Sequence, residues 1–157
     1  MASLSTPLST QDLPEYMRVT PIEISTATMV QWLKPEPVGE TEKHWVDQLE
    51  PGDYEIYDEK LNNILDEARE IFVRSGVTNL LTAGDLIVAI YTANGDLANA
   101  SAGTYLHCVT GCLPVKYVMF KYFTDPSVRV EEGDIFYTNE ARYGGIHNPD
   151  QMAFMPV

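Results

Sequence analysis

The sequence predicts an α/β fold, with a mixed α+β arrangement as the alternative, in which helices pack on a mixed sheet behind an extended proline-rich arm. Three observations predict this class: an amphipathic helix precedes a β-rich hairpin, a second helix follows, and short strands flank a glycine loop. The chain has 157 residues, the size of one ordinary domain. The predicted division is an acidic arm over residues 1–57 and a domain over residues 58–157.

The arm is distinguished by its charge and its prolines. Residues 1–57 contain ten acidic and three basic residues, and six of the ten prolines lie at or before position 51. Proline removes a backbone donor and restricts the residue before it, which disfavours long regular elements. Trp32 and Trp45 are nevertheless too apolar for a simple disordered tail. Two interpretations stay open: these side chains pack on another molecule, or they cap the core of this domain.

A helix is predicted from about Asp58 to Arg74. Asp58 is the predicted N-cap, Arg74 suits the negative end of the helix dipole, and Gly76 suits the C′ position. One apolar face is formed by Leu61, Ile64, Leu65, Ala68, Ile71 and Phe72. We expect this helix to be scaffold.

A hairpin is predicted after this helix. Residues 85–92 form an apolar, β-rich run, Asn94-Gly95 is a turn signal, and a second short strand leads to Ala100. Because the first strand is apolar on both faces, it is predicted to be central in its sheet.

The last third of the chain predicts one more helix and two short strands. The helix covers about residues 109–123, or begins at Pro114, because proline is favoured in the first turn. Strands over residues 134–138 and 152–157 then flank the glycine loop.

Composition excludes several classes of function. The net charge is −13, which argues against non-specific nucleic-acid binding and against docking on an anionic membrane. The sequence contains no run of 18 apolar residues, so no transmembrane helix is predicted, and the N-terminus lacks the pattern of a signal peptide. The chain has two cysteines, too few for a disulfide scaffold, so a cytoplasmic location is expected.

The glycine loop over residues 139–150 is the first candidate site. His147 and Asp150 are three residues apart, and carboxylate and imidazole groups held close together bind divalent metals. Gly144-Gly145 allows positive φ or a close approach of the backbone. The alternative is a surface turn in which His147 and Asp150 cap one another.

His107, between the hairpin and the second helix, is the second candidate. The start of a helix is a favourable position for anionic groups or substrate. The alternative is a core histidine with its hydrogen bonds satisfied. No phosphate-binding motif of the G-x-x-x-x-G-K-[ST] type is present, so a nucleotide used in the reaction would bind to another polypeptide.

Residues 130–140 (VEEGDIFYTNE) and 143–150 (YGGIHNPD) together resemble the hydantoinase B/oxoprolinase superfamily. Its pattern is roughly GD-[VI]-F-x-x-ND-P-x-x-GG-x-H-x-x-D. Upstream, residues 59–74, 87–97 and 104–107 resemble, in the same order, the family's first helix, its hairpin and its [IV]-P-[VI]-H segment. The resemblance covers residues 57–157, and it is closest to the B-type subunits of the ATP-dependent ketone carboxylases for acetone and acetophenone.

This resemblance implies one subunit of a hetero-oligomeric, ATP-dependent carboxylase that acts on a small ketone and bicarbonate. A hydantoinase A-like partner binds ATP and phosphorylates the enol and bicarbonate, and the B-type subunit holds a divalent metal where the fragments are joined. His147 and Asp150 match metal ligands, Glu140 is a possible third, and His107 and Glu140 are the candidate catalytic residues. Manganese, magnesium, zinc or iron all suit such a ligand set.

The sequence departs from the family pattern in two ways. Asn139-Glu140-Ala141 replaces Asn-Asp-Pro, and a glutamate reaches one methylene further than an aspartate. Subunits of this type also run to several hundred residues, and a further histidine ligand would lie beyond Val157. The chain therefore resembles the N-terminal part of such a subunit, which is not expected to be active alone.

Two other functions remain open. The family pattern also allows an ATP-dependent cyclic-amide hydrolase of the hydantoinase or 5-oxoprolinase type. A non-catalytic role is the third possibility, in which the acidic arm holds partner subunits together.

Overall fold

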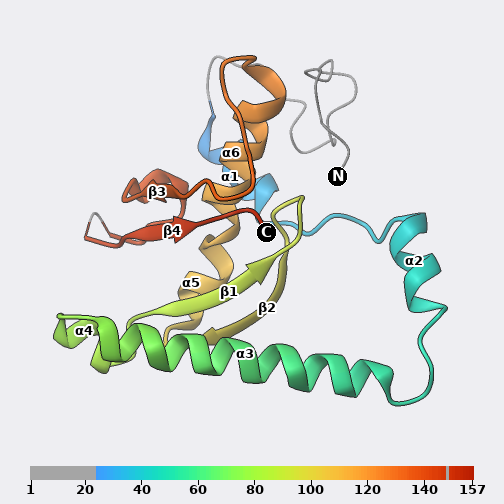
Figure 1. The fold of residues 1–157 in the computed structure, drawn as a ribbon. Helices are drawn as coiled ribbons and strands as arrows, with labels where there is room; N and C mark the ends of the chain where they lie inside the picture. The colour runs from blue at the N-terminus through green and yellow to red at the C-terminus, as the bar shows by residue number, and fades with distance from the viewer. Residues whose placement is uncertain (1–23, 148) are drawn as a thin grey trace. The chain divides into compact units, whose positions relative to one another are not determined.

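The computed structural model describes residues 24–147 and 149–157, and these form two compact units. The hairpin unit contains residues 35–92 and 96–108, and the loop unit contains the described residues up to Lys34, residues 93–95 and residues 109–157. Figure 1 shows the course of the chain. Each unit is described by itself.

The hairpin unit is a long helix packed on a two-stranded sheet (Figure 1). Strand β1 (Ile87–Tyr91) pairs antiparallel with β2 (Leu97–Ala102). Helix α3 (Asp53–Ser75) lies along this hairpin, and α2 (Glu40–Val46) and α4 (Asn79–Thr82) flank it in sequence. The predicted hairpin is confirmed, but the central position of its first strand is wrong: among the described residues β1 pairs with β2 alone.

Helix α3 begins five residues before its predicted start. Its N-cap is Gly52, at φ 96°, and Asp53 and Glu55 occupy the first turn, where acidic side chains stabilise the positive end of the helix. Asp58 is therefore an interior residue, not an N-cap. The predicted end near Arg74 is confirmed to within one residue, but Gly76 is the C-cap, with an extended φ of −78°, and not the C′ residue; it donates its N–H to Phe72 O.

Polar pairs connect α3 to the hairpin. Ser101 Oγ donates to Asp66 Oδ1 at 2.6 Å, and Asn99 Nδ2 donates to Asp58 Oδ1 at 3.4 Å. Leu65 is the buried apolar residue of this helix. The hairpin therefore covers only the side of α3 that carries these residues.

The loop unit is built around α6 (Cys112–Thr124), which packs against α1 (Thr26–Trp32). Trp32 and Phe120 are almost fully buried, and their ring centroids are 5.9 Å apart. Lys116 is also buried and donates from Nζ to Trp32 O at 2.8 Å, so its charge lies at the negative end of α1.

The second predicted helix is interrupted. Helix α5 (Tyr105–Thr110) ends before Gly111, and α6 begins at Cys112 with Pro114 in its first turn. Proline is tolerated there because the first-turn N–H groups lack intrahelical acceptors. Strands β3 (Phe136–Thr138) and β4 (Met152–Phe154) form a second antiparallel pair in the loop unit.

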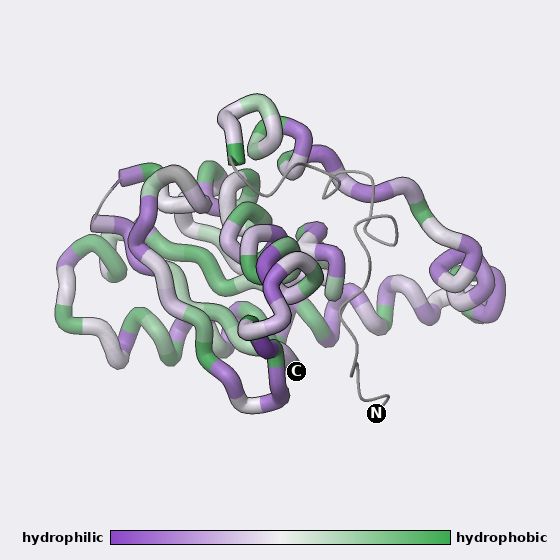
Figure 2. The backbone as a smooth tube through the Cα atoms, turned by 90° about the horizontal axis from the view of Figure 1, so that it is seen from above, coloured by the Kyte–Doolittle hydropathy of each residue, from purple (hydrophilic) through white to green (hydrophobic). Residues whose placement is uncertain are grey.

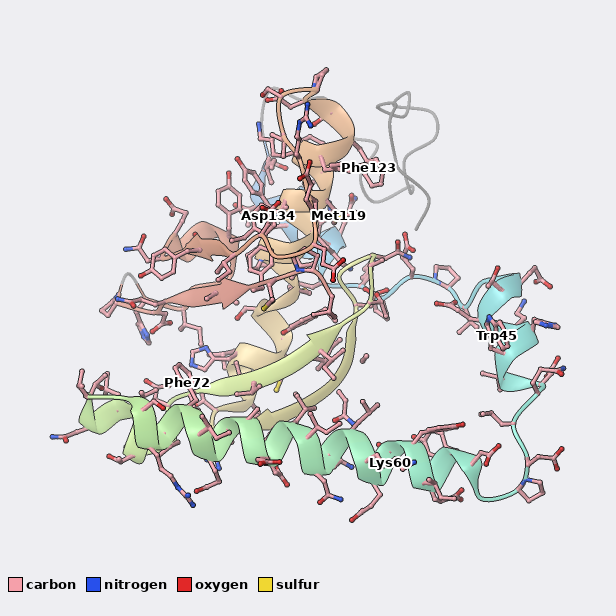
Figure 3. All side chains as sticks on the ribbon, in the orientation of Figure 1. Trp45, Lys60, Phe72, Met119, Phe123 and Asp134 are labelled. Atoms are coloured by element: carbon pink, nitrogen blue, oxygen red, sulfur yellow. The ribbon has the colours of Figure 1, made fainter. Side chains whose placement is uncertain are left out.

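The extended arm is corrected where the structure describes it. Residues 24–57 contain α1, α2 and the start of α3 instead of extended chain, and residues 1–23 lie outside the described residues. Trp32 caps the core of the loop unit, whereas Trp45 on α2 is 66% exposed (Figure 3). The prolines therefore separate short helices and do not prevent them.

The predicted class is confirmed in its mixed form. Helices combine with two small sheets, and both sheets are antiparallel. None of the helices in the described part of the chain is long and apolar enough to cross a membrane.

Candidate functional site

The glycine loop connects two paired strands of the loop unit. Phe136 lies opposite Phe154, and Thr138 lies opposite Met152. The rings of Phe136 and Phe154 are stacked, with centroids 5.4 Å apart. The pairing of the two strands therefore fixes both ends of the glycine loop.

Tight packing fixes the middle of the loop. Gly144 is buried at φ 109°, and a Cβ there would lie 2.7 Å from Pro114 Cδ and 2.8 Å from Thr110 O. The preceding Tyr143 stacks on Tyr117 of α6, with ring centroids 4.3 Å apart. Glycine is therefore required both by the backbone conformation and by the close approach to α5 and α6.

Asp150 organises the backbone of the loop. Its Oδ2 accepts the N–H of Ile146 at 2.8 Å and the N–H of His147 at 2.9 Å. Its own N–H donates to His147 O at 3.0 Å. The side chain is only 17% exposed. Hydrogen bonds of this kind orient carboxylates that bind metals, and they equally stabilise a plain turn.

His147 lies next to this carboxylate, with Nδ1 3.7 Å from Asp150 Oδ2 and 73% of its side chain exposed. Nitrogen and oxygen ligands lie about 2.0–2.2 Å from a zinc ion, so one ion can bridge two atoms at most about 4.2 Å apart. The pair is therefore close enough to share one divalent ion, but Oδ2 already accepts two amide N–H groups, so an ion would bind through Oδ1. It also fits the alternative of mutual capping, because Asp150 caps the backbone N–H of His147.

Glu140 begins the tight turn before these residues. Its N–H donates to Thr138 Oγ1 at 3.1 Å, and its carbonyl accepts the N–H of Tyr143 at 2.9 Å across the 3₁₀ turn η2 (Ala141–Tyr143). Among residues 24–147 and 149–157, no three histidine, cysteine, aspartate or glutamate side chains are grouped as a metal site. The role of Glu140 as a third ligand or catalytic residue thus stays a prediction.

His107 occupies a separate cluster in the hairpin unit. Its Nε2 lies 3.0 Å from Asp85 Oδ1, and its side chain is 14% exposed. Thr104 Oγ1 can donate its one proton to the same Asp85 oxygen at 3.2 Å or to Gly84 O at 3.3 Å. The two side chains therefore both lie within hydrogen-bond distance of one carboxylate oxygen.

A close backbone contact supports this cluster. Gly103 N–H donates to Leu86 O at 2.9 Å, and a Cβ on Gly103 would collide with Gly84 O. Gly84 itself has φ 91°. Both glycines are therefore needed to bring residues 84–86 and 103–104 together.

An imidazole paired with a carboxylate can act as a general base, since the carboxylate fixes the ring and stabilises its protonated form. With Nε2 on Asp85, Nδ1 is the remaining ring nitrogen. The same pair also secures α5 beside the start of β1, which is the structural alternative.

Sequence reasoning missed Asp85 and Thr104, for which the hairpin turn is only a partial signal. The hairpin register pairs Ile87 with Ala102. Continuing it by two residues places Asp85 opposite Thr104, and His107 follows one helical turn later. Nearer the turn, a bulge between Ile90 and Tyr91 shifts the register by one residue, so the Asn94-Gly95 signal alone does not place Asp85 opposite Thr104.

The chain is similar to proteins of one family. The hydantoinase B/oxoprolinase family matches residues 50–157. The acetophenone carboxylase delta subunit of Aromatoleum aromaticum is 45% identical over 126 residues, which make up 80% of this chain and 18% of that protein. The family match reaches upstream of the expected limit at residue 57. Because it spans well over half of the residues, the chain belongs to the hydantoinase B/oxoprolinase family.

Proposed function

We propose that the chain contributes part of a divalent-metal site to an ATP-dependent ketone carboxylase. The observation that carries the proposal is the pairing of His147 Nδ1 with Asp150 Oδ2 at 3.7 Å, in a chain 45% identical to an acetophenone carboxylase subunit. The chain spans 18% of that relative's length, so the remaining ligands would come from residues outside it. ATP would bind to a hydantoinase A-like partner subunit.

The loop residues would have distinct roles. His147 offers an exposed imidazole nitrogen, and Asp150 offers a carboxylate that the amides of Ile146 and His147 already orient. A bound dication would supply Lewis-acid stabilisation of an enolate oxygen and would position the CO₂ equivalent derived from bicarbonate. Glu140 is the candidate third oxygen ligand.

His107 would act in proton transfer. Asp85 fixes Nε2 at 3.0 Å, which leaves Nδ1 to take or return a proton at the carbon or oxygen of a small ketone. Thr104 can donate to the same carboxylate oxygen. The role of His107 would therefore be separable from metal binding.

The test uses the protein purified together with the subunits that co-elute with it. Metal content by elemental analysis and ATP-dependent fixation of labelled bicarbonate are measured for wild type, His147→Ala, His107→Ala and His44→Ala. We expect His147→Ala to lose both metal and activity. His107→Ala should retain metal but lose activity. His44, on α2, is the exposed control and should change neither. Unchanged metal content and activity in His147→Ala would refute the proposal.

The second candidate is an ATP-dependent cyclic-amide hydrolase, which the oxoprolinase branch of the family favours. The same preparation distinguishes the two. Turnover of a hydantoin or 5-oxoproline in the absence of bicarbonate would favour the hydrolase, and incorporation of label from bicarbonate into a ketone would favour the carboxylase.

A further inference from the structure

Helix α3 carries a stripe of exposed apolar side chains that its own hairpin does not cover. The stripe follows a strict alternation of three and four residues, the heptad spacing of a coiled coil. It consists of Tyr54, Tyr57, Leu61, Ile64, Ala68 and Ile71, which we call the α3 seam. Its five large side chains are between 36% and 67% exposed.

The hairpin contacts border one edge of the seam on α3, since Leu65 lies one turn after Leu61. The hairpin side is marked by Asp58, Leu65 and Asp66. Figure 2 shows hydrophobic and hydrophilic residues alternating along this helix. An exposed apolar stripe of this length is unusual on a monomer and marks an interaction surface. Its period indicates that the partner is another helix.

The charged residues beside the seam indicate which helix is the partner. Asp53, Lys60, Glu67 and Arg74 recur every seven residues along the seam's outer border (Figure 3 labels Lys60). If a second α3 runs antiparallel, centred between residues 63 and 64, Asp53 faces Arg74 of the other copy. Lys60 then faces Glu67 of the other copy. Every pair on this flank is therefore of opposite charge, while the other flank, with Asp58 and Leu65, faces the hairpin.

The apolar layers are complementary when the antiparallel pair is centred between residues 62 and 63, one residue from the centre of the charge pairs. Leu61 faces Ile64 of the other copy at the centre. The large Tyr57 faces the small Ala68, and Tyr54 faces Ile71. A parallel arrangement instead places Lys60 near Leu65, which the hairpin buries, and loses the charge pairs. Arg74 already forms an exposed 3.5 Å pair with Glu70, and exposed pairs of this kind exchange at little cost.

We propose that α3 pairs antiparallel with α3 of a second copy of this chain through the seam. The 23 residues of α3 provide about 35 Å of contact length. This interaction surface is independent of the proposed carboxylase function.

The first test compares two isoleucines of the same helix. Ile64 is 59% exposed at the centre of the seam, and Ile56 is 53% exposed away from it. Sedimentation equilibrium over a wide concentration range should show a dimer for wild type and for Ile56→Lys. Ile64→Lys should be monomeric with an unchanged circular dichroism spectrum. A monomeric wild type, or equal losses in the two variants, would overturn the proposal.

The second test uses the flanking charges. Lys60→Glu places like charges opposite each other twice in the dimer and should weaken self-association about ten-fold. Adding Glu67→Lys to the same chain restores opposite charges and should bring the dissociation constant back to within about three-fold of wild type. Failure of the double variant to recover would show that another molecule, such as a different subunit, occupies the seam.

Cross-linking tests the orientation. When chains carrying Tyr54→Cys are mixed with chains carrying Ile71→Cys, oxidation should join the two different variants. Oxidation of Tyr54→Cys chains alone should give little product through residue 54. The opposite result would indicate a parallel pair and would overturn the antiparallel arrangement.

Discussion

The glycine loop and the Asp85–His107 cluster each place a histidine beside an aspartate, but the two aspartates are used differently. In the loop, Asp150 directs its carboxylate to backbone amides, and His147 remains 73% exposed. In the cluster, Asp85 accepts the imidazole itself, and His107 is 14% exposed. One histidine is therefore held by its backbone, and the other by its ring.

This difference suits two different chemical tasks. A metal ligand must present a nitrogen that another group can bind, which an exposed imidazole such as that of His147 does. A general base works best with a fixed ring, and the 3.0 Å contact with the carboxylate of Asp85 fixes the ring of His107. We therefore expect the two histidines to respond differently to the same substitutions.

The largest effect should come from Gly103, the glycine in close backbone contact with Gly84 next to the Asp85–His107 cluster. In Gly103→Ala the new Cβ would collide with Gly84 O, a backbone atom that cannot move without displacing Asp85. We expect a loss of about 3–4 kcal/mol in the free energy of unfolding, measured by urea denaturation. Gly39→Ala is the control, because the nearest atom to its Cβ is a flexible Glu42 Oε2 at 3.6 Å. Equal midpoints for the two variants would contradict the close backbone contact.

The loop glycine should have the next largest effect. Gly144→Ala combines φ 109° with contacts of 2.7 Å to Pro114 Cδ and 2.8 Å to Thr110 O, and should cost about 2–3 kcal/mol. Gly133→Ala shares the positive φ, at 93°, but meets nothing within 4 Å, so it should cost only about 1 kcal/mol. Urea midpoints for both variants measure the difference. If they match, packing on α5 and α6 does not fix the loop.

Sequence patterns located both histidines but only part of their surroundings. The loop was predictable because its residues are contiguous in the sequence and Gly144-Gly145 predicts a turn. The Asp85–His107 pair spans 22 residues, and it requires the hairpin register to be carried past the strand ends. The start of α3 was missed because periodicity reports the apolar face, whereas Gly52 and the first-turn acids set the boundary. The prolines of the arm led to a wrong prediction of extended chain, because they limit the length of helices but do not prevent α1 and α2.

Substitutions of the two histidines should also differ in their effect on the free energy of unfolding. His107→Ala removes the hydrogen bond to Asp85 from a mostly buried ring and should cost about 1–2 kcal/mol. His147→Ala removes a side chain that is 73% exposed and should change the free energy of unfolding by less than about 0.5 kcal/mol. Thermal and urea unfolding of both variants test this. A larger loss for His147→Ala would mean that its ring, and not only its backbone, holds the loop.

The smallest effect concerns Cys108, which follows His107 on α5. Burial raises the pKa of its thiol above the ordinary value, although a backbone hydrogen bond acts in the opposite direction. The stability that follows from this shift is present below the unfolded-state pKa and is lost as the pH rises through the folded-state pKa.

Cys108 should therefore react slowly with iodoacetamide at pH 7, and faster as the pH rises past the ordinary thiol range of about 8–9. Mass spectrometry of the peptide that contains Cys108 measures this rate separately from that of Cys112. Rapid alkylation at pH 7 would contradict the raised pKa of the Cys108 thiol. Slow alkylation at pH 7 with an increase above that range would match a thiol whose charged form is disfavoured by burial.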